Sequence, residues 1–192
     1  YLFLGWYANP ECTGDAVTMI PAAVAEDIYL YAKWEKRTDL ELTVTHMLKD
    51  GAVVLEKDVK GNQTFGDVVT AESLKKEFKG YSYDSASAES ITIGTENNEI
   101  TLWYMPDSYD YTVNYLEEGT NKPLAEAKTF SASYGSEVQE NAVVIEGYSV
   151  SGDSIKAITI DTANNVINFY YTANTYDYTV NYLEEGTNKP LA

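Results

Sequence analysis

The sequence of 192 residues has few of the side chains on which catalytic and metal sites depend. It contains one histidine, His46, and one cysteine, Cys12. A single cysteine excludes a disulfide within the chain and a multi-cysteine zinc site. A nucleophile–histidine pair would depend on His46 alone, and no G-x-S-x-G motif is present. We therefore expect His46 to be structural or exposed, Cys12 to carry no chemistry, and the chain to be no enzyme, with no cofactor or metal.

Basic residues are also scarce: 13 lysines and arginines face 30 aspartates and glutamates, which gives a net charge of −17. Without a basic patch the chain would be repelled by nucleic acid and by anionic membranes. Long apolar runs are missing too, because the longest, residues 19–25, is far short of the ~18–20 residues of a membrane span. We expect no nucleic-acid partner and no membrane span in this segment. The start in mid-pattern at Tyr1, without a signal peptide, is interpreted as that of an excised fragment.

The acidic residues form no pattern typical of catalysis. Glu117 is followed by Glu118, and Glu184 by Glu185. Glycoside hydrolysis needs two carboxylates facing each other about 5–9 Å apart, whereas adjacent residues at a strand end point to opposite faces. Solvated turn charges are the favoured interpretation. A calcium site is a weaker alternative, because no D-x-D-x-D-G loop is present. A crosslink between a lysine and an asparagine or aspartate is left open.

What the sequence has in abundance is tyrosine, with 17 residues, and an internal repeat. Tyrosine favours pleated, half-buried surfaces. Residues 109–125 read YDYTVNYLEEGTNKPLA, and residues 176–192 repeat this segment without a change, 67 positions later. An older, diverged copy precedes them, since residues 80–81 and 147–148 are both Gly-Tyr at the same spacing. The chain therefore consists largely of tandem units.

Each unit has the pattern of a small sheet. Residues 109–115 alternate apolar and polar side chains, which indicates a strand with one buried face. Residues 158–160 and 166–171 predict a hairpin that closes the unit, and the Gly-Tyr step starts another strand. Residues 70–78 predict a short helix with two apolar side chains on one face. The fold class is therefore mainly β, with at most one short helix in each unit.

The earlier copy has its own alternating strand. Apolar residues and His46 alternate through residues 42–46, and in one register they match residues 111–115. The sequence leaves this register open by one residue.

Residues 1–36 follow a different pattern, with two aromatic strands separated by a loop. The first contains GWY at residues 5–7, and the second contains LYAKW at residues 30–34. This pairing resembles the C-terminal half of a Listeria–Bacteroides repeat, the internalin B-type repeat. The resemblance implies that residues 1–36 are half of such a repeat.

The units of about 67 residues resemble MucBP (mucin-binding protein) repeats. The features that carry the resemblance are the opening strand at 112–115 with its acidic, glycine-containing turn, Gly-Tyr at 147–148, and the closing aromatic strand at 168–171. It implies small β-grasp-like modules in a tandem, elongated array. The implied domains are residues 37–107, residues 108–174, and residues 175–192 as the N-terminal stub of a further unit.

The resemblance implies a segment of an extracellular, cell-wall-attached adhesin of a Gram-positive bacterium. Its partners would be host or mucosal glycoprotein such as mucin, together with the neighbouring repeats. The units would bind this glycoprotein or project a distal binding head. Two alternatives stay open: a purely structural stalk, whose units contact mainly their neighbours, and an accessory region of a large secreted enzyme.

Tyr109, Tyr111 and Tyr115 form the candidate ligand platform, because aromatic faces on a sheet can stack on sugar rings. The competing interpretation is that these rings fill the core of the unit itself. Trp34 and Trp103 are open to the same two interpretations.

Residues 176–192 hold an opening strand and turn without the rest of a unit. An isolated strand is unstable in water. We therefore expect this segment to pair with a sheet edge, including that of a neighbouring molecule, or to pack on the preceding unit.

Overall fold

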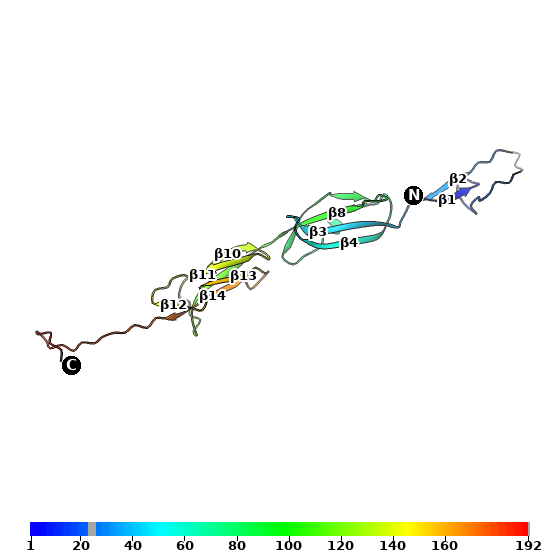
Figure 1. The fold of residues 1–192 in the computed structure, drawn as a ribbon. Helices are drawn as coiled ribbons and strands as arrows, with labels where there is room; N and C mark the ends of the chain where they lie inside the picture. The colour runs from blue at the N-terminus through cyan, green and yellow to red at the C-terminus, as the bar shows by residue number, and fades with distance from the viewer. Residues whose placement is uncertain (23–25, 192) are drawn as a thin grey trace. The chain divides into compact units, whose positions relative to one another are not determined.

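The computed structural model describes residues 1–22 and 26–191. The chain forms two compact units, Tyr1–Pro106 and Asp107–Ala192. The described residues are mainly β, as predicted, and their helical structure is one 3-10 turn, η1 (Ala71–Leu74) (Figure 1). The strands of the first unit are β1 (Leu2–Tyr7), β2 (Tyr31–Glu35), β3 (Leu40–Leu48), β4 (Val54–Gln63), β5 (Val68–Thr70), β6 (Tyr81–Ala86), β7 (Ser90–Thr92) and β8 (Glu99–Pro106). Those of the second unit are β9 (Ser108–Glu117), β10 (Lys128–Ser133), β11 (Glu137–Asn141), β12 (Tyr148–Ser151), β13 (Ile155–Thr159) and β14 (Val166–Ala173).

The two aromatic segments near the N-terminus pair with each other. β1 and β2 form an antiparallel two-stranded sheet, with an irregularity in register between Phe3 and Gly5. The loop that follows β1 returns to this sheet, because the N–H of Val17 donates to the carbonyl of Trp6 at 2.7 Å. Tyr7 is buried, and the Lys33 ammonium lies 5.2 Å from the centre of its ring. Lys33 also donates to the backbone carbonyl of Cys12. The predicted apolar run 19–25 falls partly on residues 23–25, outside the described residues.

The first unit is built on a four-stranded sheet in the order β4-β3-β8-β6. Its two central strands, β3 and β8, are parallel, and the outer strands are antiparallel to them. A small sheet of β5 and β7 and the turn η1 supply the other side of the core. This arrangement agrees with the β-grasp-like modules that were predicted. The buried core consists of Leu40, Leu42, Val44, Ala71, Leu74, Ile93, Ile100, Leu102 and Tyr104.

The second unit repeats the same design. Its large sheet has the order β10-β9-β14-β12, with β9 and β14 parallel in the centre, and its small sheet is β11-β13. The registers fix how the two copies correspond. Thr43 pairs with Glu99 in the first unit, and Thr112 pairs with Val166 in the second. Residues 42–46 therefore correspond to residues 111–115, so His46 occupies the place of Tyr115.

The predicted closing hairpin at residues 158–171 is wrong. β13 pairs with β11 in the small sheet, whereas β14 pairs with β9 and β12 in the large sheet. The reason is the connection between them, which is closed by the side chain of Asn165. Its amide donates to the carbonyl of Asp161 at 2.7 Å, and its oxygen accepts from the N–H of Asp161 at 2.8 Å. The turn passes the chain from one sheet to the other.

The predicted helix at residues 70–78 is reduced to η1. The Thr70 hydroxyl caps this turn by accepting from the N–H of Ser73 at 3.4 Å, and Ala71 and Leu74, three residues apart, are buried. A 3-10 turn places residues three apart on one face, so it buries this pair without a full helix. The turn ends at Lys75, whose ψ is 141°. Residues 75–77 then form neither helix nor strand.

The predicted pairing of residues 176–192 with a sheet edge of the same chain is absent from the described residues. The segment contains no strand, and its one bridge, Leu183 to Pro190, lies within it. Packing on the preceding unit is also wrong, because Tyr176 is 75% and Tyr178 87% exposed. An alternating sequence alone does not hold a strand without neighbours. Ala192 lies outside the described residues.

Candidate functional site

The tyrosines predicted as a ligand platform lie mostly inside the second unit. Tyr111 is 7% and Tyr115 2% exposed, and both belong to its core. The ring of Tyr115 stacks on that of Phe169, with centroids 6.1 Å apart. Tyr109 is half-buried against Tyr134. Of these three tyrosines, therefore, only Tyr109 has part of its ring at the surface of the folded unit.

The first unit has an open groove that the sequence reasoning missed. It has a volume of about 800 Å³ and lies between the segment after η1 and strand β6. Leu74 anchors that segment in the core, and Gly80, with φ of 78°, turns the chain back into β6. Both walls of the groove, the segment after η1 and strand β6, are therefore held in place by the fold. Its lining consists of Lys75, Lys76, Glu77, Phe78, Lys79, Tyr81, Ser82 and Tyr83.

Lysines and aromatic rings are interleaved along this groove. The Lys75 ammonium lies 4.0 Å from the centre of the Tyr83 ring and 2.5 Å from a carboxylate oxygen of Glu72. Phe78 packs edge-on against Tyr104 of the core, with centroids 5.0 Å apart. Ammonium groups beside rings combine hydrogen-bond donors with apolar faces. Such a surface suits a ligand that has hydroxyl groups and apolar faces.

Lys76 is held by two carboxylates of β4. Its ammonium contacts Glu56 at 2.6 Å and also Asp58. The hydrogen bonds that the Lys76 ammonium donates to these carboxylates, that to Asp58 first, raise the pKa of Lys76, and the bond from Lys76 lowers the pKa of Asp58. Both groups stay charged near neutral pH, and their side chains are 35% and 27% exposed. A charged, solvated ammonium is a poor nucleophile, so we interpret this contact as an ion pair and not as the precursor of a covalent crosslink.

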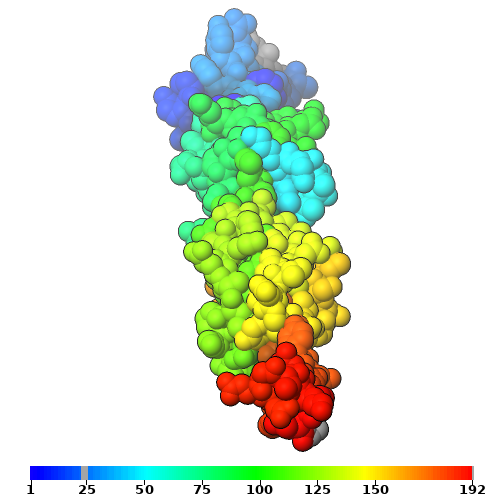
Figure 2. Space-filling view, turned by 90° about the vertical axis from the view of Figure 1, so that its left-hand side faces the viewer, coloured from blue at the N-terminus to red at the C-terminus, as the bar shows by residue number. Residues whose placement is uncertain are grey.

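The second unit has different side chains at the same place. The positions of Lys75, Lys76 and Lys79 correspond to Ala142, Val143 and Glu146. The stretch around residues 142–150, coloured yellow in Figure 2, lies at the surface of this unit, and Val144 is fully exposed. The groove of interleaved lysines and rings is therefore a property of the first unit and not of the fold.

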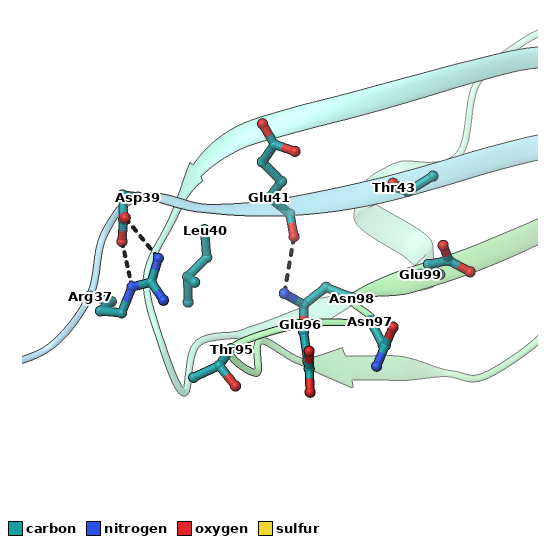
Figure 3. Close-up of a pocket in the computed structure, with 10 residues that line it drawn as sticks. All are labelled: Arg37, Asp39, Leu40, Glu41, Thr43, Thr95, Glu96, Asn97, Asn98 and Glu99. Carbon is teal, nitrogen blue, oxygen red and sulfur yellow. Dashed lines mark hydrogen bonds and ion pairs between the residues drawn. The ribbon is translucent and has the colours of Figure 1, made fainter. Parts of the chain in front are cut away.

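A second, smaller cavity of about 370 Å³ lies at the start of β3, beside the turn that precedes β8 (Figure 3). Arg37 binds Asp39 there through two hydrogen bonds of 2.8 Å, and Asn98 donates to the carbonyl of Glu41 at 3.0 Å. Its lining includes four acidic side chains, those of Asp39, Glu41, Glu96 and Glu99. Among the described residues, however, no three acidic, histidine or cysteine side chains are placed to hold a metal ion.

The remaining residues singled out in the sequence have structural positions. His46 is fully buried, and Cys12 is a free, partly exposed thiol in the loop after β1. Glu117 accepts from the Thr120 hydroxyl at 2.7 Å, and Glu118 is exposed, so this pair belongs to a turn. No helix in the described part of the chain is long and apolar enough to cross a membrane.

Three aromatic side chains are exposed together on the β1–β2 sheet. The ring centroids of Phe3 and Trp34 are 5.1 Å apart, and those of Phe3 and Trp6 are 5.6 Å apart. Trp34 is 59% exposed. Trp34 therefore lies at a surface, whereas Trp103 is half-buried on β8.

Comparison with known proteins gives the family. The model of the MucBP domain family matches residues 41–105 and 111–172, so the chain belongs to the MucBP domain family. A putative membrane protein of Evansella cellulosilytica is 31% identical over 139 residues, which are 71% of this chain and 20% of that protein. The chain thus spans about a fifth of the length of this relative.

Two solved structures are also similar. They are the type 2 repeat of the mucus binding protein MUB from Lactobacillus reuteri, at 15% identity, and Mub-RV, at 14% identity. Each comparison has a TM-score of 0.29 and covers 70% of this chain and 99% of the other. The family assignment rests on the two MucBP matches.

Proposed function

We propose that this chain is a segment of an extracellular, cell-wall-attached protein of a Gram-positive bacterium, and that its MucBP units bind mucosal glycoprotein. The observation that carries this proposal is the tandem pair of MucBP matches. We infer a binding role rather than catalysis. Residues 1–36 are proposed as the C-terminal half of a Listeria–Bacteroides repeat, and residues 175–192 as the opening of a further MucBP unit.

The contact surface that we propose is the groove of the first unit between residues 75 and 83. A saccharide presents hydroxyl groups, which donate and accept, together with the apolar faces of its rings. The ammonium groups of Lys75 and Lys79, the carboxylate of Glu77 and the ring of Tyr83 supply matching groups. Because Glu77 lines the groove, and carboxylates outside it pair with Lys75 and Lys76, the groove suits a largely neutral glycan better than a polyanion. Of the tyrosines predicted as a platform, Tyr109 stays a secondary candidate.

Binding to mucin-coated surfaces tests this proposal directly. We expect the full chain to bind, and the double variant Lys75→Ser/Lys79→Ser to lose most of the binding. The matched control is Lys122→Ser/Lys189→Ser, which removes the same charge from two exposed turns outside the groove. Equal loss in both variants would show attraction by charge alone and contradict the groove as the site.

A stalk is the second candidate function. The unchanged repetition of residues 109–125 at 176–192 favours it, because duplication lengthens a stalk without any new binding site. If the full chain binds mucin no better than an unrelated acidic repeat protein does, the binding proposal fails and the stalk is supported. A catalytic domain in the full reading frame would instead support an accessory region of an enzyme.

A further inference from the structure

In each MucBP domain the first and last strands are direct neighbours and run parallel: they are β3 and β8 in the first unit, which also holds β1 and β2, and β9 and β14 in the second. In the first unit β3 and β8 pair over six positions, from Thr43 with Glu99 to Leu48 with Tyr104. In the second unit β9 and β14 also pair over six positions, from Thr112 with Val166 to Glu117 with Tyr171. The chain therefore comes into each MucBP domain on one central strand and leaves it on the strand beside it.

This arrangement decides how the unit responds to tension. The start of β9 and the end of β14 lie at opposite ends of the same parallel ladder. A pull on the two ends of the unit is directed along the strands, in opposite senses, while the ladder hydrogen bonds run across from strand to strand. The two strands can then slide past each other only if all the hydrogen bonds of the ladder break at once. In an antiparallel hairpin pulled at its two open ends, the bonds would break one at a time.

The ladder is closed at both ends by the same hydrogen bonds in the two units. In the first unit the N–H of Thr43 donates to the carbonyl of Asn98 at 2.8 Å, and the N–H of Lys49 donates to that of Tyr104 at 3.0 Å. The second unit repeats this through Thr112 to Asn165 and Glu118 to Tyr171, each at 2.9 Å. The two strands are thus paired over the whole overlap, with no frayed end from which separation could begin.

A buried asparagine adds a side-chain latch at the start of the ladder. Asn98 is 7% exposed and donates to the carbonyl of Glu41 on β3 at 3.0 Å (Figure 3). Asn165 is 8% exposed and donates to the carbonyl of Asp110 on β9 at 3.3 Å. Each amide also closes its own turn just before the last strand. Each asparagine side chain therefore ties the first strand, β3 or β9, to the residue just before the last strand, β8 or β14.

From this topology we propose that each MucBP unit is a load-bearing element, in which the parallel pair of first and last strands is a shear clamp. The clamps are β3–β8 and β9–β14. The outer strands β4, β6, β10 and β12 lie outside the direct path of the force and contribute mainly to equilibrium stability. The clamp requires no ligand, so this inference stands or falls independently of mucin binding.

Single-molecule pulling of the full chain, in a Cys12→Ser background, tests the clamp through the direction of force. Handles on Asp107→Cys and Asn174→Cys load β9 against β14 in shear. Handles on Asp107→Cys and Ser136→Cys pull at the open end of the β9–β10 hairpin, where Ser108 pairs with Ser133. We expect a several-fold higher unfolding force in the first geometry. Equal or reversed forces would overturn the proposal.

Pulling through the two chain ends gives a second readout. Each unit is expected to unfold in one step that lengthens the chain by roughly 200 Å, because some 66 residues become extended. Asn165→Ala should lower the force of one step. Phe130→Ala, on the edge strand β10 and 41% exposed in the wild type, should leave that force unchanged while it lowers the unfolding temperature. The reverse order of the two variants would contradict a clamp at β9–β14.

Discussion

The Nδ1 atom of His46 lies 3.1 Å from the hydroxyl oxygen of Tyr104, and both side chains are buried in the core of the first unit. The same hydroxyl oxygen accepts from the N–H of Lys76 at 3.1 Å. Its own proton is therefore available to Nδ1, an arrangement in which the ring is neutral. In the second unit Tyr115 replaces His46, and the hydroxyl of Tyr171 donates to the carbonyl of Val143 at 2.8 Å instead.

This contact predicts that the first unit loses stability in mild acid. Burial lowers the pKa of His46 below its ordinary value of 6.5. The unfolded chain then takes up a proton at pH values where the folded unit does not, so stability is full above pH 6.5 or so and falls as the pH drops below it. All three tryptophans lie in the first unit. Urea unfolding followed by tryptophan fluorescence at pH 7.5 and at pH 5.5 should show the loss.

The control for this prediction is His46→Met. It removes the titrating group and keeps an apolar side chain that adapts to the space. The variant should be less stable than the wild type at pH 7.5, because Tyr104 loses a partner, but its stability should change little between the two pH values. If the stability of the variant depends on pH as strongly as that of the wild type, then His46 is not the titrating group and the prediction fails.

The asparagine latches should contribute to equilibrium stability as well as to force. Asn165→Ala leaves the carbonyls of Asp110 and Asp161 and the N–H of Asp161 without their side-chain partner. Loss of buried hydrogen-bond partners costs about 1–3 kcal/mol. Asn98→Ala should cost the same amount in the first unit. Calorimetry of the two units reports both, and Gln139→Ala, at an exposed position, should stay within about 0.5 kcal/mol.

Tyr111 is predicted to ionise later than an ordinary tyrosine. Its hydroxyl donates to a carboxylate oxygen of Glu140 at 2.7 Å, and this bond, with burial, raises the pKa of Tyr111 to about 12. A raised tyrosine pKa means that the second unit is fully stabilised below pH 10 and loses stability as the pH rises toward 12. Titration of ¹³C-labelled tyrosine by NMR measures this directly. Glu140→Gln should bring the value down, and an unchanged value would exclude the carboxylate as the cause.

Much of the fold could be predicted from the sequence, because the period of 67 residues and the alternation in each strand are local signals. The pairing of strands could not be predicted. Residues 158–160 and 166–171 are close in sequence and alternate correctly, yet they lie in different sheets. What sends them apart is a turn that depends on the buried side chain of Asn165, and no periodicity reports such a contact.

The candidate site was harder to predict, because alternation shows that one face of a strand is buried without showing how fully. Tyr111 and Tyr115 turned out to fill the core. The groove was hidden because residues 70–78 match a helical pattern, whereas only four of them form a 3-10 turn. A usable signal was present: three lysines at 75–79 in a very acidic chain, where the second copy, at residues 142–146, has none.

The repeated segment allows a direct test of how far neighbouring strands, rather than local sequence, decide a structure. Tyr115 and Tyr182 occupy the same position in two identical stretches of 17 residues, but the first is 2% and the second 63% exposed. Tyr115 has β10 and β14 on either side of its strand, whereas residues 174–182 form no strand. Tyr115→Ala should therefore destabilise the second unit by about 3–5 kcal/mol, as truncation of a large buried ring does.

Tyr182→Ala, the same change in the same local sequence, should alter stability by less than about 0.5 kcal/mol. Thermal unfolding of the second unit, followed by near-ultraviolet circular dichroism of tyrosine, measures both variants. Removal of residues 176–192 should likewise leave the unfolding temperature unchanged. If Tyr182→Ala or the deletion lowers it substantially, then the segment is paired in solution, and light scattering would show whether its partner is the sheet edge of a second molecule.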